Sequence, residues 1–147
     1  MSQDAPVNTE KTQYRLEDQI GFKLRLANQK HLELFAAMLP EATPTQFAIL
    51  ARLYADGSLS QNHLGRRVGM DAATTKGVVD RLRTKGWVQS APSKTDLRRL
   101  EISLTEAGNA FAKRAIETAG RISEQSLSNL TPRETERLLA LLAKISR

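Results

Sequence analysis

The chain has 147 residues, of which 40% are hydrophobic and 26% are charged, so it is long enough for one domain with a hydrophobic core. The absence of cysteine excludes disulfide bonds, thiolate zinc sites and cysteine-based redox sensing. No apolar run approaches the roughly 20 residues of a membrane-spanning helix, and the polar residues 1–12 lack the apolar segment of a signal peptide. We therefore predict a cytoplasmic protein with no membrane partner, a flexible tail over residues 1–12 and a single domain over residues 13–147.

The formal net charge of +6 is concentrated in one stretch of the sequence. Residues 61–100 hold nine basic and three acidic residues, an excess of six, whereas the rest of the chain holds thirteen of each sign. Such a local excess suits the phosphate backbone of a nucleic acid. The alternative interpretation is a solvated basic face without an anionic partner.

The amino-terminal part predicts two helices. Apolar residues spaced by three and four from Leu16 to Ala27 predict a long helix over residues 14–39, which Pro40 ends. The run Thr43-Pro44-Thr45-Gln46 combines a capping box with proline at the first helical position. It predicts a second helix that ends at Asp56-Gly57 and has a core stripe of Phe47, Leu50 and Leu53.

Two shorter helices follow, joined by the two-residue turn Gly69-Met70. Ser60 is a good N-cap for a third helix that ends at Gly69. Asp71 is expected to cap a fourth helix, which runs to about Lys85 before Gly86. The apolar residues expected to face inward are Leu64, Val68, Val78, Val79 and Leu82.

The period of the apolar pattern then changes to two. Residues 87–90 and 100–104 predict the strands of a β-hairpin, and the turn-rich residues 91–96 predict its long polar tip. Thr105 opens a fifth helix, whose inward residues include Phe111, Ala115 and Ile122. A second capping box, Thr131-Pro132-Arg133-Glu134, opens a sixth helix that is expected to bury Leu138, Leu141, Leu142 and Ile145.

This order of elements predicts a mainly α protein with a small β-hairpin wing, that is, a winged helix-turn-helix. A short turn between the third and fourth helices lets them cross steeply and leaves the fourth helix able to enter a major groove. A helical hairpin with a decorated surface is the simpler alternative, but the basic hairpin that follows favours DNA binding. The residues expected to contact DNA are Ser60, Gln61, Ala73, Thr74, Lys76, Gly77, Arg81, Arg83, Lys94, Asp96, Arg98 and Arg99.

Two other classes of function fit less well. An enzyme is not predicted, because His31 and His63 lie on different helices without metal-ligand spacing, and neither a phosphate-binding glycine loop nor a nucleophile elbow occurs. No cofactor is predicted. A winged helix that contacts only proteins would not need nine basic residues on its reading head and wing.

Several segments resemble the multiple-antibiotic-resistance regulator (MarR) family. The wing carries Asp96-Leu97-Arg98 followed by Leu104-Thr105-Glu106-Ala107-Gly108, which is similar to the family's Asp-x-Arg and Leu-Thr-x-x-Gly. Thr43-Pro44-Thr45-Gln46-Phe47 and the spacing of Leu82, Gly86 and Val88 are similar too. The resemblance covers the chain from about Tyr14 to the end. Trp87, where the family usually has leucine, and Ala42, at a site that is often larger, depart from the pattern.

The resemblance implies a ligand-responsive transcription regulator that binds double-stranded DNA at a pseudo-palindromic operator. It implies a homodimer held by helices within residues 13–39 and 105–147, with residues 43–104 as the DNA-binding lobe. A surplus of apolar helix face agrees with a dimer, although a monomer whose terminal helices cover one another is the alternative. The resemblance also implies that Arg98 enters the minor groove and that Asp96 holds the shape of the wing.

A small-molecule pocket between the dimerisation helices and the reading head is a further implication, often for an aromatic acid or phenol. Arg25 and His31 are spaced as in family members that respond to aromatic carboxylates. Arginine pairs bidentately with a carboxylate, and histidine bonds a ring hydroxyl or nitrogen. The alternative is that Arg25 is a surface cation and His31 a partly buried ring with its own partner. The candidate ligand-binding residues are Arg25, His31, Phe22, Asn28 and Phe47.

Overall fold

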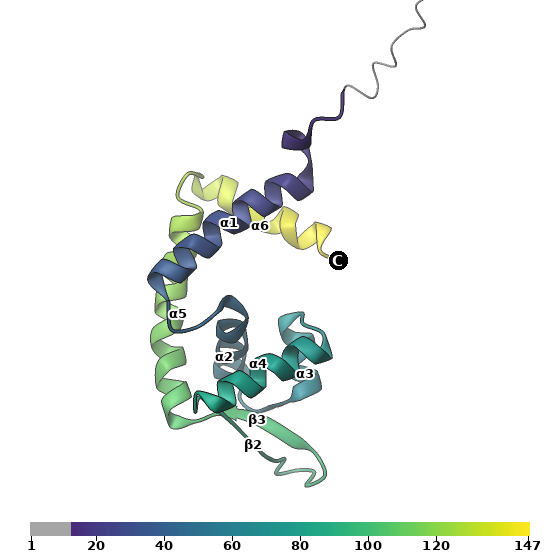
Figure 1. Cartoon of the computed structure of the whole chain (residues 1–147), viewed down its shortest axis with the longest axis vertical. Coiled ribbons are helices and arrows are strands. Elements are labelled where there is room, and N and C mark those ends of the chain that lie inside the picture. Colours follow the sequence, from purple (N-terminus) through teal and green to yellow (C-terminus); the bar gives the residue numbers. More distant parts are fainter. Residues whose placement is uncertain (1–12) are drawn as a thin grey trace, which may run out of the picture.

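The computed structural model describes residues 13–147, so the tail predicted over residues 1–12 lies outside the described part of the chain. The fold is mainly helical with a small antiparallel sheet, as the sequence predicts (Figure 1). The elements in chain order are η1 (Leu16–Asp18), α1 (Ile20–Met38), α2 (Pro44–Asp56), β1 (Leu59–Ser60), α3 (Gln61–Val68), α4 (Ala72–Thr84), β2 (Val88–Pro92), β3 (Leu100–Leu104), α5 (Glu106–Ser126) and α6 (Pro132–Ile145).

Local capping signals explain where the helices begin. Thr43 and Thr131 each form the predicted capping box. The threonine side chain accepts from the N–H of the third helical residue, and the side chain of that residue accepts from the threonine N–H. The N–H of Thr131 donates to Glu134, and this hydrogen bond lowers the pKa of the Glu134 carboxyl. Ser60 and Asp71 cap α3 and α4 in the same way. These four helix starts lie where the sequence predicts them.

The central lobe consists of α2, α3, α4 and the sheet, whose strand order is β1-β3-β2. Apolar residues of all three helices and of β3 meet in its core, among them the fully buried Leu50, Leu64 and Val79 and the nearly buried Ile102. Removing these side chains from water is the main force that holds the lobe together. The packed lobe fixes the position of α4 relative to the hairpin.

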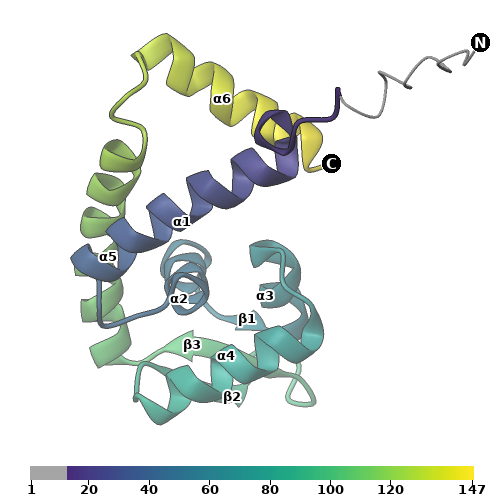
Figure 2. The same cartoon turned by 45° about the horizontal axis from the view of Figure 1, so that its top comes forward.

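Helix α5 extends from this lobe to the other end of the molecule, where α1 and α6 lie (Figure 2). Its first half packs on α2 and its second half on α1, and it buries Phe111, Ala115 and Ile122 as expected. The ring of Trp87 stacks on Phe111, with centroids 4.1 Å apart and planes 10° from parallel. The tryptophan that departs from the family pattern thus joins the wing to α5.

The prediction of one helix over residues 14–39 is wrong at its start. Residues Leu16–Asp18 form the separate turn η1, and α1 begins at Ile20 because Gln19 is extended. The N–H of Gln19 donates to the Leu16 carbonyl and its side-chain amide donates to the Arg15 carbonyl. These bonds satisfy the groups that a continuous helix would have paired.

The sheet differs from the prediction in two ways. A two-residue strand, β1, pairs with β3 through Leu59 opposite Ile102, and two residues are too few for a periodic pattern to reveal. Strand β2 begins at Val88 and continues through Ala91 and Pro92, which the sequence places in the turn. Proline is tolerated there because β2 is an edge strand. It pairs with β3 on one side only, so N–H groups on its other side have no strand to bind.

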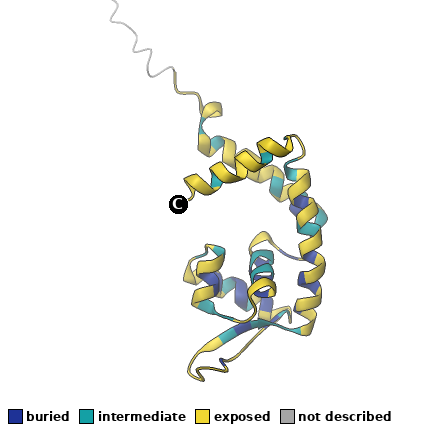
Figure 3. Cartoon of the chain, turned by 180° about the vertical axis from the view of Figure 1, so that it is seen from behind, coloured by how far each residue is buried: buried dark blue, intermediate teal, exposed yellow. Residues whose placement is uncertain are grey.

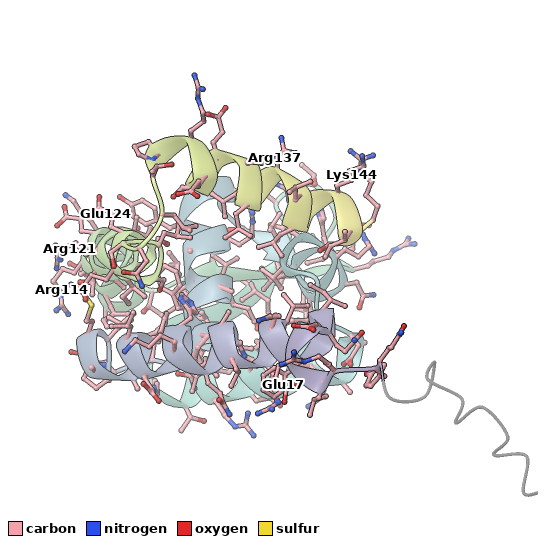
Figure 4. All side chains as sticks on the ribbon, turned by 90° about the horizontal axis from the view of Figure 1, so that it is seen from above. Glu17, Arg114, Arg121, Glu124, Arg137 and Lys144 are labelled. Atoms are coloured by element: carbon pink, nitrogen blue, oxygen red, sulfur yellow. The ribbon has the colours of Figure 1, made fainter. Side chains whose placement is uncertain are left out.

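The prediction that α6 buries its apolar stripe is wrong for the single chain. Leu138, Leu141 and Ile145 are exposed, and Leu142 is half-buried (Figure 3). Seen from above, α6 and α1 lie apart (Figure 4), and no other helix or strand within residues 13–147 packs along α6. The stripe therefore lacks a cover within the described chain.

No helix within residues 13–147 combines the length and the apolar character that a membrane crossing requires.

Gly108 lies where the first turn of α5 meets the backbone of Trp87. The N–H of Thr105 donates to the Trp87 carbonyl over 3.0 Å, and a Cβ at Gly108 would overlap that same carbonyl. We expect Gly108→Ala to lower the free energy of unfolding by about 1–3 kcal/mol, because the clash is with backbone that cannot rotate away. Urea unfolding at fixed protein concentration measures the change.

Gly120 on the same helix is the matched control, since a Cβ there meets nothing within 4 Å. Gly120→Ala is expected to be neutral or to stabilise by up to about 1 kcal/mol through helix propensity. Equal effects of the two substitutions would contradict the close approach at Gly108.

Candidate nucleic-acid interface

Helices α3 and α4 approach each other closely at Gly65. A Cβ there would lie 2.7 Å from the hydroxyl oxygen of Thr75, which is only 1% exposed and donates to the Asp71 carbonyl. Gly69 ends α3 with a φ of 72°, a left-handed conformation that glycine adopts without strain. The small residue and the tight turn allow the close contact of two consecutive helices that a helix-turn-helix requires.

Helix α4 has one buried and one exposed face. Thr75, Val78, Val79 and Leu82 point into the lobe. We call the opposite side the recognition face and define it by Ala73, Thr74, Lys76, Gly77, Asp80, Arg81 and Arg83. All of these are exposed except Gly77 and Asp80, which are half-buried. The structure therefore places the α4 residues that the sequence selects on one side of the helix.

Three of the charged residues on the recognition face are linked to one another. Asp80 lies 2.8 Å from Lys76 Nζ and 2.9 Å from an Arg83 guanidinium nitrogen. The hydrogen bond from Lys76 is the main cause that lowers the pKa of the Asp80 carboxyl below its ordinary value. Arg83 also donates to the Ser90 hydroxyl on β2 over 2.7 Å. Arg81 forms no ion pair with any residue in 13–147.

Hydrogen bonds within the wing tip fix the direction of its basic residues. Asp96 accepts from the Arg98 N–H through its carboxylate and from the Arg99 N–H through its carbonyl, both at 3.0 Å. The buried Ser93 donates its N–H to the Arg99 carbonyl and accepts from two N–H groups of the turn. Asp96 thus contributes to the shape of the wing, while the side chains of Lys94 and Arg98 are exposed.

The start of α3 and the tip side of the wing share a depression of about 380 Å³, whose lining includes Ser60, Gln61, Arg66 and Arg99. Ser60 caps α3 by accepting from the His63 N–H, so its position is fixed by the helix it begins. Arg66 is not among the residues that the sequence predicts to contact DNA. In the sequence, Arg66 is only one of several basic residues in the stretch 61–100. Its proximity to Arg99 could not be predicted, because the two residues are far apart in the chain.

The candidate ligand residues on α1 do not face one another. At about 100° per residue, Arg25 and His31 are about 120° apart around the helix. Arg25 lies over the ring of Phe22, 5.2 Å from its centroid, and is exposed. His31 Nδ1 lies 2.8 Å from the Ser126 hydroxyl oxygen of α5. Asn28 is exposed.

Phe47, the fifth candidate, is half-buried and contacts Phe35 edge to face at 6.0 Å. None of the five residues lines the main cavity described for the chain, which has a volume of about 480 Å³ and lies at the elbow between α1 and α2. That cavity is mostly apolar, and its charged lining residues are Glu41 and Lys85. Lys85 Nζ donates to the Glu41 carbonyl and the Gln46 side chain.

Within residues 13–147, no group of three or more histidine, aspartate or glutamate side chains is placed to hold a metal ion. The chemistry that the described charges support is the binding of anions by α4 and the wing, since basic residues outnumber acidic ones there.

The α3–α4 pair is followed by a basic β2–β3 hairpin, which forms a three-stranded antiparallel sheet with β1, and this arrangement defines a winged helix-turn-helix protein. The chain belongs to the MarR family, whose model matches residues 42–100. It is 37% identical over 136 residues to the transcriptional repressor NicR of Pseudomonas putida, across 91% of this chain and 86% of that protein. It is a DNA-binding transcription regulator.

Solved structures agree over nearly the whole chain. A probable transcriptional regulator from Pseudomonas aeruginosa is 47% identical with a TM-score of 0.83, covering 89% of this chain and 99% of that one. Bordetella bronchiseptica BpsR, whose DNA binding is regulated by 6-hydroxynicotinic acid, is 29% identical with a TM-score of 0.85 and coverages of 90% and 96%. A mutant Escherichia coli MarR complexed with operator DNA is 25% identical with a TM-score of 0.79 and coverages of 96% and 99%.

Arg98 tests the role of the wing. Its backbone N–H is tied to Asp96, but its guanidinium has no hydrogen bond or ion pair within residues 13–147. We expect Arg98→Ala to weaken operator binding by about 1–3 kcal/mol without changing the unfolding midpoint, because the guanidinium has no partner in the fold and is predicted to bind the minor groove. A binding titration at fixed salt and a thermal melt measure the two quantities.

Arg114, an exposed arginine on α5, is the control. Arg114→Ala removes the same charge away from the wing, so it is expected to change operator affinity less. Wild-type affinity in Arg98→Ala would refute the assignment of this side chain.

Proposed function

We propose that this regulator is a homodimeric repressor that leaves its operator when a small aromatic carboxylate or phenol binds. The observation that carries the DNA-binding part is the shared orientation of α4 and the wing. Both lie at one end of the lobe, remote from α1 and α6, and the sequence stretch that contains them holds the whole excess of positive charge (Figure 1). The twelve residues predicted to contact DNA are proposed as this interface.

The proposal of a dimer is supported by apolar side chains at the other end of the molecule. Ile20 and Leu24 on α1 are 62% and 43% exposed, and the stripe on α6 is uncovered as described above. A second copy related by a twofold axis would cover both faces. The two α4 helices would then enter successive major grooves, so we propose an inverted-repeat operator with half-sites about 10 base pairs apart.

A charge in the α6 stripe tests the dimer. We expect Leu141→Glu to shift the protein from dimer to monomer at micromolar concentration, because a buried carboxylate without a partner opposes association. Light scattering coupled to gel filtration measures the mass. Ala140→Glu, on the opposite side of α6, is the control and is expected to remain dimeric; a monomeric wild type would refute the proposal.

The proposal of an aromatic acid as effector is supported by the chemistry of Arg25 and by the likeness to BpsR. A guanidinium can take a carboxylate bidentately while the neighbouring ring of Phe22 offers an apolar contact. His31, already within hydrogen-bond distance of Ser126, can bond a ring hydroxyl or nitrogen if that contact opens. Because these side chains point in different directions on α1, we propose that the site is completed only when a second copy is present.

Coupling to DNA follows from the position of α1. This helix belongs to the proposed dimer platform, and its elbow with α2 is tied to the end of α4 by Lys85. A ligand that binds the DNA-free arrangement more tightly shifts the protein toward it. A change in the distance between the two α4 helices would take one of them out of register with its groove.

Arg25→Ala tests the effector site. We expect this variant to bind operator as wild type does but to lose the response to aromatic acids, for which the wild-type shift in affinity should be about 5–150-fold. The measurement is an operator titration with and without 6-hydroxynicotinic acid and salicylic acid as probes.

Lys23→Ala removes a neighbouring exposed charge and is the control. Lys85→Met examines the elbow cavity in the same assay. If the Arg25→Ala variant leaves the operator at the same ligand concentration as wild type, and the Lys85→Met variant no longer leaves it, the effector binds at the elbow cavity and not at Arg25.

A further inference from the structure

Asp80 occupies an unexpected place for an acidic residue. It is the only acid within α4, and at about 100° per residue it lies about 160° around the helix from the fully buried Leu82. Its carboxylate therefore lies near the middle of the recognition face, the side of α4 that is proposed to meet the negatively charged DNA.

The carboxylate holds two of the three basic residues of α4. Lys76 and Arg83 bind its two oxygens at 2.8 Å and 2.9 Å, while the third basic residue, Arg81, is outside this arrangement. In the DNA-free protein two cations of the recognition face thus share one carboxylate, which offsets one of their two positive charges. Any DNA phosphate that uses Lys76 or Arg83 must compete with Asp80 for them.

We propose that Asp80 is a specificity-determining residue that weakens binding to DNA of arbitrary sequence more than binding to the operator. The inference rests on the proposed function, because it concerns the same DNA-binding face. It needs no contact between Asp80 and a base. The carboxylate acts through its repulsion of phosphates and through its hold on Lys76 and Arg83.

The asymmetry follows from what stabilises each kind of complex. Binding to arbitrary DNA depends almost entirely on phosphate contacts and the release of counterions, so a central negative charge and two occupied cations reduce it directly. Operator binding also gains from contacts to base edges. Those contacts remain when Asp80 is present, and they profit because its ion pairs hold the two long side chains in fixed positions.

The hydrogen bond from Arg83 to Ser90 adds a second, separable contribution. It ties the recognition face to β2, so Arg83 is held from both sides. Ser90→Ala removes this tie without changing any charge. It therefore separates the rigidity of the wing from the electrostatic effect of the carboxylate.

The test is Asp80→Asn, which keeps the size of the side chain and removes its charge. Fluorescence anisotropy measures binding to a random-sequence 30-base-pair duplex and to a duplex selected by the wild-type protein from a random library, over a series of salt concentrations. We expect affinity for the random duplex to rise about tenfold and affinity for the selected duplex to change less than about threefold. The slope of the logarithm of the binding constant against the logarithm of salt concentration should become steeper by about one to two on random DNA. Each additional phosphate contact contributes about 0.9 to this slope.

Asp56→Asn is the matched control, because Asp56 also holds two cations, Arg52 and Arg67, at 3.6 Å and 3.1 Å. It makes the same change in net charge but lies outside the recognition face. We expect Asp56→Asn and Ser90→Ala to raise binding to random DNA less than twofold. Circular dichroism verifies that all three variants are folded.

Each outcome decides the inference. A rise on random DNA that Asp56→Asn matches would show an effect of net charge alone and would overturn it. A loss of affinity for the selected duplex in Asp80→Asn, with unchanged binding to random DNA, would make Asp80 a base-reading residue and would also overturn it. If the wild-type protein binds neither duplex, the proposed function itself fails.

Discussion

The contact between the first turn of α5 and the backbone of Trp87 is the constraint on which the rest of the structure depends. Gly86, with a φ of 79°, follows the last turn of α4, and Trp87, whose N–H donates to the Leu82 carbonyl of α4, leads directly into β2. Thr105 binds the carbonyls of Gly86 and Trp87, and Gly108 leaves room for this approach. The end of the recognition helix, the base of the wing and the start of α5 therefore move as one unit.

This joint has a consequence for how a signal can travel. The ring of Trp87 stacks on Phe111 on one side and receives the ammonium group of Lys85 at 4.8 Å from its centroid. Lys85 in turn binds the Glu41 carbonyl and Gln46 at the elbow of α1 and α2. The elbow that follows α1 is thus tied to the end of α4 by direct contacts of Lys85.

The sequence predicted most of the fold because most of its signals are local. Capping boxes at Thr43 and Thr131, the caps at Ser60 and Asp71 and the turn at Gly69 all act within one helical turn, and the structure has each of them in place. The recognition face followed from the period of α4 alone. The start of α1 was misjudged, because the apolar spacing continues through residues where Gln19 makes other hydrogen bonds.

By itself, the sequence determined the order of the helices, the hairpin and the concentration of positive charge in residues 61–100, since each depends on residues close together in the chain. Only the tertiary structure decided the pairing of β1 with β3, the depression that joins Ser60 to Arg99 and the directions of Arg25 and His31. The tertiary structure also shows that the apolar stripe on α6 is exposed in the single chain. These features depend on groups far apart in the sequence, because whether a side chain is buried or paired is set by what packs against it and not by its own spacing.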